Sequence, residues 1–346
     1  MIAILALALA APDPDPVALV RRLGDQSFAI REEAEAALLG LGLAAKPALE
    51  TGLTDRDLEI RARCERLLAK VRTAEREGRI QAFLDAPAVT LPGWKRYQAI
   101  VQQADRKRFV AIYRAEADLL ERPTELAVRI RDLPLGVLLS DRESAILAGL
   151  PAWLLLAGDP EIQVEPAVLT ELLTGLELLA RRESIRKDFL AIPGHAELLM
   201  AVCQRGGAAG LPLMADLKLP AGKAHALALA LRAAEPAILR ASAILVVARL
   251  GTRDDVAPLR PLLNDTTAVG MATVGGTRLN AELGDVALAA MLQLQGEKLE
   301  DYGFPHARVV PGLKALPAPE RLGFIDAAGR KTARERWEKK FGVVNP

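Results

Sequence analysis

The sequence predicts an all-α protein, a curved α-α superhelix of stacked helix pairs, with one small β-hairpin inserted near residues 269–282. Three observations support this fold class. The hydrophobic half of the 346 residues is dominated by Ala and Leu, and aromatic residues make up only 4%, a composition that favours helices over strands. One stretch recurs at a fixed offset, so that Leu23 returns as Leu53. A single segment lacks helical periodicity and contains Gly275-Gly276.

The recurring stretch lies near the start of the chain, where "LGDQSFAIREEAEAALLGLG" is followed by "LTDRDLEIRARCERLLAKV". A single helix pair has apolar surface that it cannot cover alone, and stacking further pairs covers it. The fixed offset therefore predicts stacked helix pairs. Leu23, Asp25, Ile30, Arg31, Glu35 and Leu38 recur as Leu53, Asp55, Ile60, Arg61, Glu65 and Leu68.

The first helix of the repeat is capped by Asp25 or Ser27, since either side chain can accept from an orphan amide. Gly40 and Gly42 end this helix. A second helix follows with Pro47 in its first turn, where no hydrogen bond is lost, and the next runs from Asp55–Asp57 to about Val71.

This pattern resembles HEAT-like α-helical repeats, over residues 17–72. The resemblance implies a HEAT/armadillo-like solenoid in which the turn Asp and the helix Arg pair along the stack, here Asp25 with Arg31 and Asp55 with Arg61. Three later blocks resemble exported bacterial HEAT-like proteins, a family without assigned function. These blocks are "LPGWKRYQAIV", "LGTRDDVAPLRPLLND" and "DVALAAMLQLQGEKLEDYGF".

The rest of the chain is also mostly helical in pattern. Pro134 breaks one apolar stretch. The run from Ser144 to Gly158 is too short and too closely bounded by charge for a membrane span, so we expect a buried helix. Further helices are expected near 141–157, 165–181, 195–205, 221–233, 235–250 and 254–263.

Gly275-Gly276 lies between two β-prone runs and is a two-residue hairpin signal, although an ordered loop is the alternative. A helix from Asp285 to Gln295 follows. Phe324, Trp337 and Phe341 are expected to anchor the last helix.

We divide the chain into four parts. Residues 1–16 form an apolar run and an acidic, Pro-rich spacer; this start resembles a signal peptide with a cleavage-type Ala8-Leu9-Ala10, although it lacks a leading Lys or Arg. A frayed apolar terminus is the alternative. Residues 17–85 are the HEAT-like repeats, 86–268 divergent helical repeats, and 269–346 the hairpin and the capping helices. We expect a periplasmic or secreted protein; the alternative is a cytoplasmic one.

The residues that carry most enzyme chemistry are few and dispersed. His195, His225 and His306 are far apart in sequence, and no metal-binding spacing or Gly-x-Ser-x-Gly motif occurs. Cys64 and Cys203 form no Cys-x-x-Cys pair; Cys64 aligns with Ala34 and is expected in the core, and a bridge between the two cysteines stays open. We expect no catalytic, cofactor-binding or metal-binding residues and no cofactor.

Several other features have a structural interpretation that we prefer. The acid pairs are assigned to helix starts, and the Gly-Gly pairs are not phosphate loops. Trp94 is expected to be the most exposed tryptophan, although its loop docks on the helices, and Arg330–Lys340 is interpreted as a solvated helix face with local ion pairs. The acid pairs and Gly-Gly pairs are Glu32-Glu33, Asp254-Asp255, Gly206-Gly207 and Gly275-Gly276.

The predicted function is a non-catalytic scaffold of the cell envelope that binds a protein or peptide partner. The formal charge of +1, from 45 basic and 44 acidic residues, argues against a dedicated nucleic-acid binder. The alternative is a helical-repeat module that binds nucleic acid or another polyanion. A third possibility is an enzyme with an unrecognised site.

Overall fold

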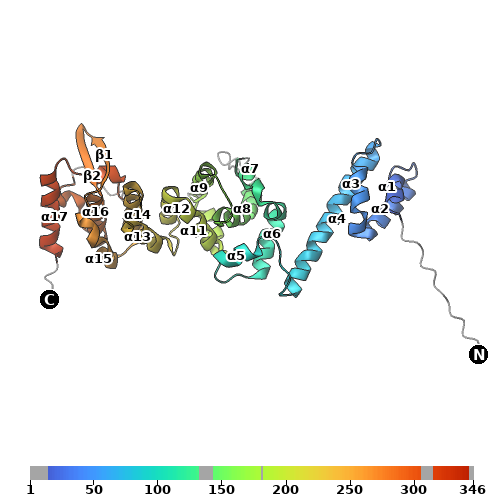
Figure 1. Cartoon of the computed structure of the whole chain (residues 1–346), viewed down its shortest axis with the longest axis horizontal. Coiled ribbons are helices and arrows are strands. Elements are labelled where there is room, and N and C mark those ends of the chain that lie inside the picture. Colours follow the sequence, from blue (N-terminus) through green and yellow to red (C-terminus); the bar gives the residue numbers. More distant parts are fainter. Residues whose placement is uncertain (1–14, 132–142, 181, 305–314, 343–346) are drawn as a thin grey trace, which may run out of the picture. The chain divides into compact units, whose positions relative to one another are not determined.

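The computed structural model describes residues 15–131, 143–180, 182–304 and 315–342, which are mostly helical with one small antiparallel hairpin (Figure 1). This confirms the predicted helical class and the hairpin. The chain divides into two compact units, Met1–Leu91 (unit 1) and Pro92–Pro346 (unit 2). No helix in the described ranges is both long and apolar enough to cross a membrane.

Unit 1 is built from two pairs of helices whose bounds follow the offset found in the sequence. The two short helices have the same length and begin at equivalent positions of the repeat, Pro16 and Lys46, and the two longer helices begin at the equivalent Phe28 and Leu58. A 3₁₀ turn, Gly42–Ala45, joins the pairs. The helices are α1 (Pro16–Arg22), α2 (Phe28–Leu41), α3 (Lys46–Gly52) and α4 (Leu58–Asp85).

The helix ends of unit 1 have local causes. Ser27 occupies the N-cap position of α2 without a side-chain cap bond, and the Asp25 carboxylate instead accepts from the Ser27 amide at 2.8 Å. Gly42 ends α2 with a φ of +55°, a conformation that glycine adopts without steric cost. Pro47 lies in the first turn of α3 as predicted. Helix α4, however, continues past the expected end at Val71 as far as Asp85.

The core of unit 1 lies between the two helix pairs. Ala34 and Cys64 occupy equivalent positions and are both completely buried, which confirms the prediction for Cys64. A Cβ at Gly52 would lie 2.4 Å from the Cys64 Sγ, so only glycine lets α3 approach α4 this closely. The core side chains are Leu19, Val20, Leu23, Ala34, Leu38, Ala45, Ala48, Leu49, Ile60, Cys64, Leu67, Leu68 and Val71.

The first half of unit 2 packs around a buried helix, α8. Helices α6 and α11 contact α8, and Leu154, Leu155 and Leu156 are completely buried, which confirms that the apolar run is a buried helix. Pro134 lies outside the described residues. The helices are α5 (Trp94–Ile100), α6 (Arg106–Glu121), α7 (Leu126–Arg131), α8 (Glu143–Gly158), α9 (Pro166–Ala180), α10 (Glu183–Ala191) and α11 (His195–Arg205).

The second half of unit 2 packs α14 against both α13 and α16. The helix expected at 254–263 is interrupted: the short α15 lies between the 3₁₀ turns Arg253–Asp255 and Arg260–Asn264. Pro261 lacks the amide that an α-helix would need there. The helices are α12 (Gly210–Asp216), α13 (Gly222–Leu231), α14 (Ala237–Leu250), α15 (Val256–Leu259), α16 (Leu283–Gln295) and α17 (Ala327–Phe341).

The hairpin consists of β1 (Ala268–Val274) and β2 (Thr277–Glu282). Gly275 and Gly276 have φ of +57° and +79°, which fits the two-residue turn that the sequence predicts. A lone hairpin is marginally stable. Here Asn280 and Phe324 exchange backbone hydrogen bonds of 2.9 and 3.2 Å, and β2 contacts α16, so the hairpin is held to the helices.

Candidate interaction surface

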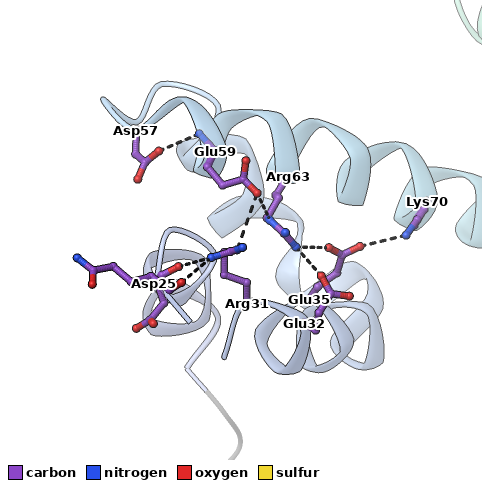
Figure 2. A network of polar contacts seen from close by, with 9 residues as sticks. Asp25, Arg31, Glu32, Glu35, Asp57, Glu59, Arg63 and Lys70 are labelled. Carbon is purple, nitrogen blue, oxygen red and sulfur yellow. Dashed lines mark hydrogen bonds and ion pairs between the residues drawn. The ribbon is translucent and has the colours of Figure 1, made fainter. Parts of the chain in front are cut away.

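A network of charged side chains joins α2 to α4 in unit 1 (Figure 2). Its centre is Arg63 of α4, which is only 6% exposed. The guanidinium donates to Glu59 at 2.6 Å, to Glu32 at 2.9 Å and to Glu35 at 3.0 Å. A buried cation is costly unless it is paired, and here three carboxylates surround it.

The electrostatics of the network favour the charged forms of Glu59 and Arg63. The hydrogen bond that Arg63 donates lowers the pKa of Glu59, and the bonds that Arg63 donates to Glu32 and Glu59 raise its own pKa. Glu35 also accepts from Lys70 at 3.1 Å. Each acid is engaged in holding two helices together, so the network is a structural joint between the two helix pairs.

The two arginines of the repeat bind backbone carbonyls of their own turns. Arg31 donates to the carbonyl oxygens of Asp25 and Gln26 at 2.7 and 3.1 Å (Figure 2). Arg61 donates to the carbonyl oxygen of Asp55 at 2.9 Å. The contact is therefore between arginine side chain and Asp backbone. The expected pairing of the Asp and Arg side chains along the stack is wrong.

The Asp carboxylates have a different partner. They accept from the amides two residues later, those of Ser27 and Asp57, which fixes the turn before each long helix. The Arg31 side chain also contributes to the contacts between the pairs, because its Nε lies 3.9 Å from Glu59 Oε1.

One side of α4 is open, and we call it the α4 edge. Its four residues are all exposed and lie on one helical face at spacings typical of a helix. In the repeat they are equivalent to the α2 face that carries Glu32 and Glu35, the acids that hold Arg63. The α4 edge consists of Leu58, Ala62, Glu65 and Ala69; its equivalents are Phe28, Glu32, Glu35 and Leu39.

Two pairs of equivalent residues differ in burial, whereas Phe28, the equivalent of Leu58, is itself 64% exposed. Leu23 is completely buried, whereas its equivalent Leu53 is 38% exposed, and Leu58 at the start of α4 is 71% exposed. Glu35 binds Arg63 and Lys70, whereas Glu65 has no ion-pair partner among the described residues. The second pair therefore covers Leu23 and Glu35 of the first, whereas Leu53 and Glu65 are uncovered.

The two histidines in the described ranges lie on different helices, His195 on α11 and His225 on α13. His195 is buried, with its Nδ1 3.2 Å from the carbonyl oxygen of Phe189, and burial lowers its pKa. Burial also lowers the pKa of His225, and His306 lies outside the described residues. Within the described ranges, no three His, Cys, Asp or Glu side chains are grouped so that they could hold a metal ion.

The acid pairs have structural partners. Glu33 binds Arg22 at 2.9 Å, and Glu32 and Glu33 lie in the second turn of α2, so their assignment to a helix start is wrong. Asp255 accepts from the amide of Thr252 at 2.7 Å and caps a 3₁₀ turn, as predicted for Asp254-Asp255. Gly206-Gly207 directly follows α11, as expected.

The tryptophans are all buried. Trp94 is 5% exposed, no more than Trp153, so the docking of its loop on the helices is confirmed and the greater exposure expected of its ring is not found. Gly93 has a φ of +86° and starts α5 with a tight turn, after which the Trp94 ring packs on Phe109 with centroids 5.3 Å apart. The Trp337 indole donates to Gln295 at 2.9 Å, so this residue anchors α17 as predicted.

The basic run in α17 is only partly a solvated face. Lys331 pairs locally with Glu335 at 3.7 Å, as expected. Arg330 instead donates from Nε to both carboxylate oxygens of the completely buried Asp285, at 2.8 and 3.0 Å, and Arg334 lies 3.8 Å from Asp285. For these two arginines the prediction is wrong. Burial raises the pKa of Asp285, while Arg330 opposes that rise.

Both cysteines are free and buried. Burial raises the pKa of Cys64 to about 11 and that of Cys203 to about 12. A thiol with so high a pKa is a poor nucleophile at neutral pH.

Two features were missed from the sequence, Arg63 and the α4 edge. Arg63 lies three residues after Ile60 and four before Leu67, so a charged residue on the apolar face of α4 was the available signal. The α4 edge was visible as the positions equivalent to Glu32 and Glu35. No protein-family model, curated protein or solved structure matches the chain, so the family resemblance stays a prediction.

Proposed function

We propose that the chain is a non-catalytic, HEAT-like helical-repeat scaffold that binds a protein partner through the α4 edge. The observation that carries this proposal is the contrast between equivalent residues: Glu35 is mostly buried and Leu23 is completely buried, whereas Glu65 on the edge and Leu53 before it are exposed. Repeat proteins bury such surface by adding the next repeat. The helices of the two pairs begin at equivalent positions, which supports the repeat interpretation.

The chemistry of the α4 edge describes its partner. The equivalent face of α2 holds a helix that presents Arg63 to Glu32 and Glu35. On the α4 edge, Glu65 is the equivalent of Glu35, and Leu58 and Ala62 supply apolar contact. We therefore expect an amphipathic helix, within a helix pair of the partner, that carries an arginine facing Glu65. Location in the cell envelope stays part of the proposal.

Site-specific photocrosslinking tests this function. A photoreactive amino acid replaces Leu58 in the full chain, expressed in its source organism. Leu43 is the matched control, because it is 51% exposed and lies on the Gly42–Ala45 turn. We expect one main protein adduct at position 58, absent at position 43, and at least about tenfold weaker when Glu65→Arg reverses the edge charge.

Three outcomes would contradict the proposal: no adduct at position 58, the same adduct at both positions, or a crosslink confined to the chain itself. The alternative of a nucleic-acid-binding module is tested by binding to random double-stranded DNA at several salt concentrations. Phosphate contacts give an affinity that falls steeply with salt, and we expect no such binding. Turnover of a substrate would favour the third possibility, an enzyme.

A further inference from the structure

A basic pocket lies in unit 2 between the ends of four helices. Its volume is about 640 Å³, and four of its ten lining residues are cationic while one is acidic. This volume is in the range of small-molecule sites. The cations are Arg186 of α10, Lys218 after α12, Lys223 of α13 and Arg249 of α14.

Two of the four cations are paired with acids. Arg249 forms an ion pair with Asp216, the acidic lining residue, and Lys223 lies 3.0 Å from the carboxylate of Asp255. Arg186 and Lys218 have no acidic partner among the described residues. The pocket thus carries two positive charges that are not neutralised locally.

Interactions with helix ends explain the positions of only some of these four cations. The C-terminal ends of α12 and α14 border the pocket, and their carbonyl groups favour the cations Lys218 and Arg249. Lys223 lies in the first turn of α13, where the helix dipole disfavours a cation. Arg186 lies in the middle of α10, where neither helix end supplies a partner.

The backbone at Lys218 gives a second, independent observation. Lys218 is the only described non-glycine residue with a positive φ, +52°. The amides of Lys218 and Leu219 bond to the carbonyls of Ala215 and Met214 at 3.3 and 3.1 Å, the C-terminal motif that usually has glycine at this position. Lysine at this position has a conformational cost that glycine would not have, and Lys218 lines the pocket.

We propose that this pocket binds a small organic anion with two or more negative charges, a phosphate ester or a polycarboxylate. The Arg186 guanidinium and the Lys218 ammonium contact its oxygens directly. An arginine fork and a lysine point charge are the usual pair for such groups. Lys223 and Arg249 keep their acids and add positive potential to the wall of the pocket.

Calorimetric titration of the full chain with pyrophosphate and with citrate tests the site. We expect saturable 1:1 binding of at least one probe, and the probe that binds assigns the phosphate or the carboxylate class. Arg186→Gln should weaken it about tenfold. Lys187→Gln is the matched control, because Lys187 is the next residue of α10, is exposed and pairs with Glu183; it should leave the affinity unchanged.

The substitution Lys218→Gly separates binding from folding. Glycine relieves the positive φ, so the melting temperature of unit 2 should rise, by about 2 °C or more, while the affinity falls about tenfold. A residue with only a structural role would not lower the affinity while raising the melting temperature.

The proposal is overturned if neither probe binds saturably, if Lys187→Gln weakens binding as much as Arg186→Gln, or if Lys218→Gly leaves the affinity unchanged. A single-stranded oligonucleotide that displaces the probe and binds more tightly than either would assign the pocket to a polyanion and also overturn it.

Discussion

Each unit contains a buried charged side chain, but the two are arranged in opposite ways. In unit 1 the buried group is a cation, Arg63, and Glu32 and Glu59 beside it are half exposed. In unit 2 the most deeply buried charged group is an anion, Asp285, with no exposure at all, and Arg330 that reaches it is itself mostly buried. The loss in free energy of unfolding when an ion-pair partner is removed therefore depends on whether the remaining charged groups can become hydrated.

The largest effect is expected from Arg330→Met, which leaves Asp285 buried without its main partner. Breaking a buried ion pair in this way costs about 3–5 kcal/mol of the free energy of unfolding. Urea unfolding followed by tryptophan fluorescence measures it in unit 2, which contains Trp94, Trp153 and Trp337. The exposed neighbour Lys331→Met is the control. Equal losses for both variants would contradict the comparison.

Arg63→Met should have a smaller effect, about 2 kcal/mol, because Glu32 and Glu59 can become hydrated once the cation is gone. Hydrogen exchange in peptides from α2 and α4 measures the loss, and the exposed Arg66→Met is the control. A loss as large as that of Arg330→Met would mean that the acids of unit 1 are trapped in the same way as Asp285.

Acidification should act on the two units with opposite signs. The folded-state pKa of Asp285 is raised, so its contribution to stability is present at low pH and is lost as the pH rises through that pKa. The folded-state pKa of Glu59 is lowered, so its contribution is present at higher pH and is lost as the pH falls through that pKa.

Hydrogen exchange measured from pH 7 downwards tests these signs. Between pH 7 and about 4, near the unfolded pKa values, protection at the start of α16 should increase severalfold. Below about pH 4 the contact between α2 and α4 should weaken. The increase at α16 should disappear in Asp285→Asn; a change in the same direction in both units would contradict the prediction.

The smallest effect is expected from Arg31→Lys. Lysine cannot donate to two carbonyl oxygens with a planar fork, and the site is partly exposed, so the loss should be at most about 1 kcal/mol. Arg61→Lys should cost less, because Arg61 bonds to the Asp55 carbonyl and lacks a neighbour equivalent to Glu59 among the described residues. Thermal unfolding of unit 1 compares the two variants.

Local rules predicted the parts of the fold that local chemistry decides. Gly42 ends α2, Pro47 starts α3, and Gly275-Gly276 turns the hairpin, because each depends on the φ or amide of one or two residues. The end of α4 was missed because residues 72–78 are mostly polar and end in a glycine, whereas the helix continues to Ile80 and Phe83, which are buried.

The charged contacts were harder to predict, since they depend on distant residues. Arg330 looked like part of a solvated face because Asp285, its partner, is 45 residues away. Docking of the Trp94 loop was expected, but the loop signal carried no information about its contact with Phe109. The residues of the α4 edge could be identified from the repeat in the sequence. Which side of the repeat is exposed became clear only from the structure, where Leu23 is buried and Leu53 is exposed.

The buried thiols have a practical consequence for all of these measurements. The natural chain has two cysteines, and one is buried in each unit, Cys64 in unit 1 and Cys203 in unit 2. A thiol-specific reagent can modify either only when its own unit opens, so the rate of modification reports the opening of that unit. Peptide mapping of the modified cysteine then distinguishes the opening rate of unit 1 from that of unit 2 without any engineered label.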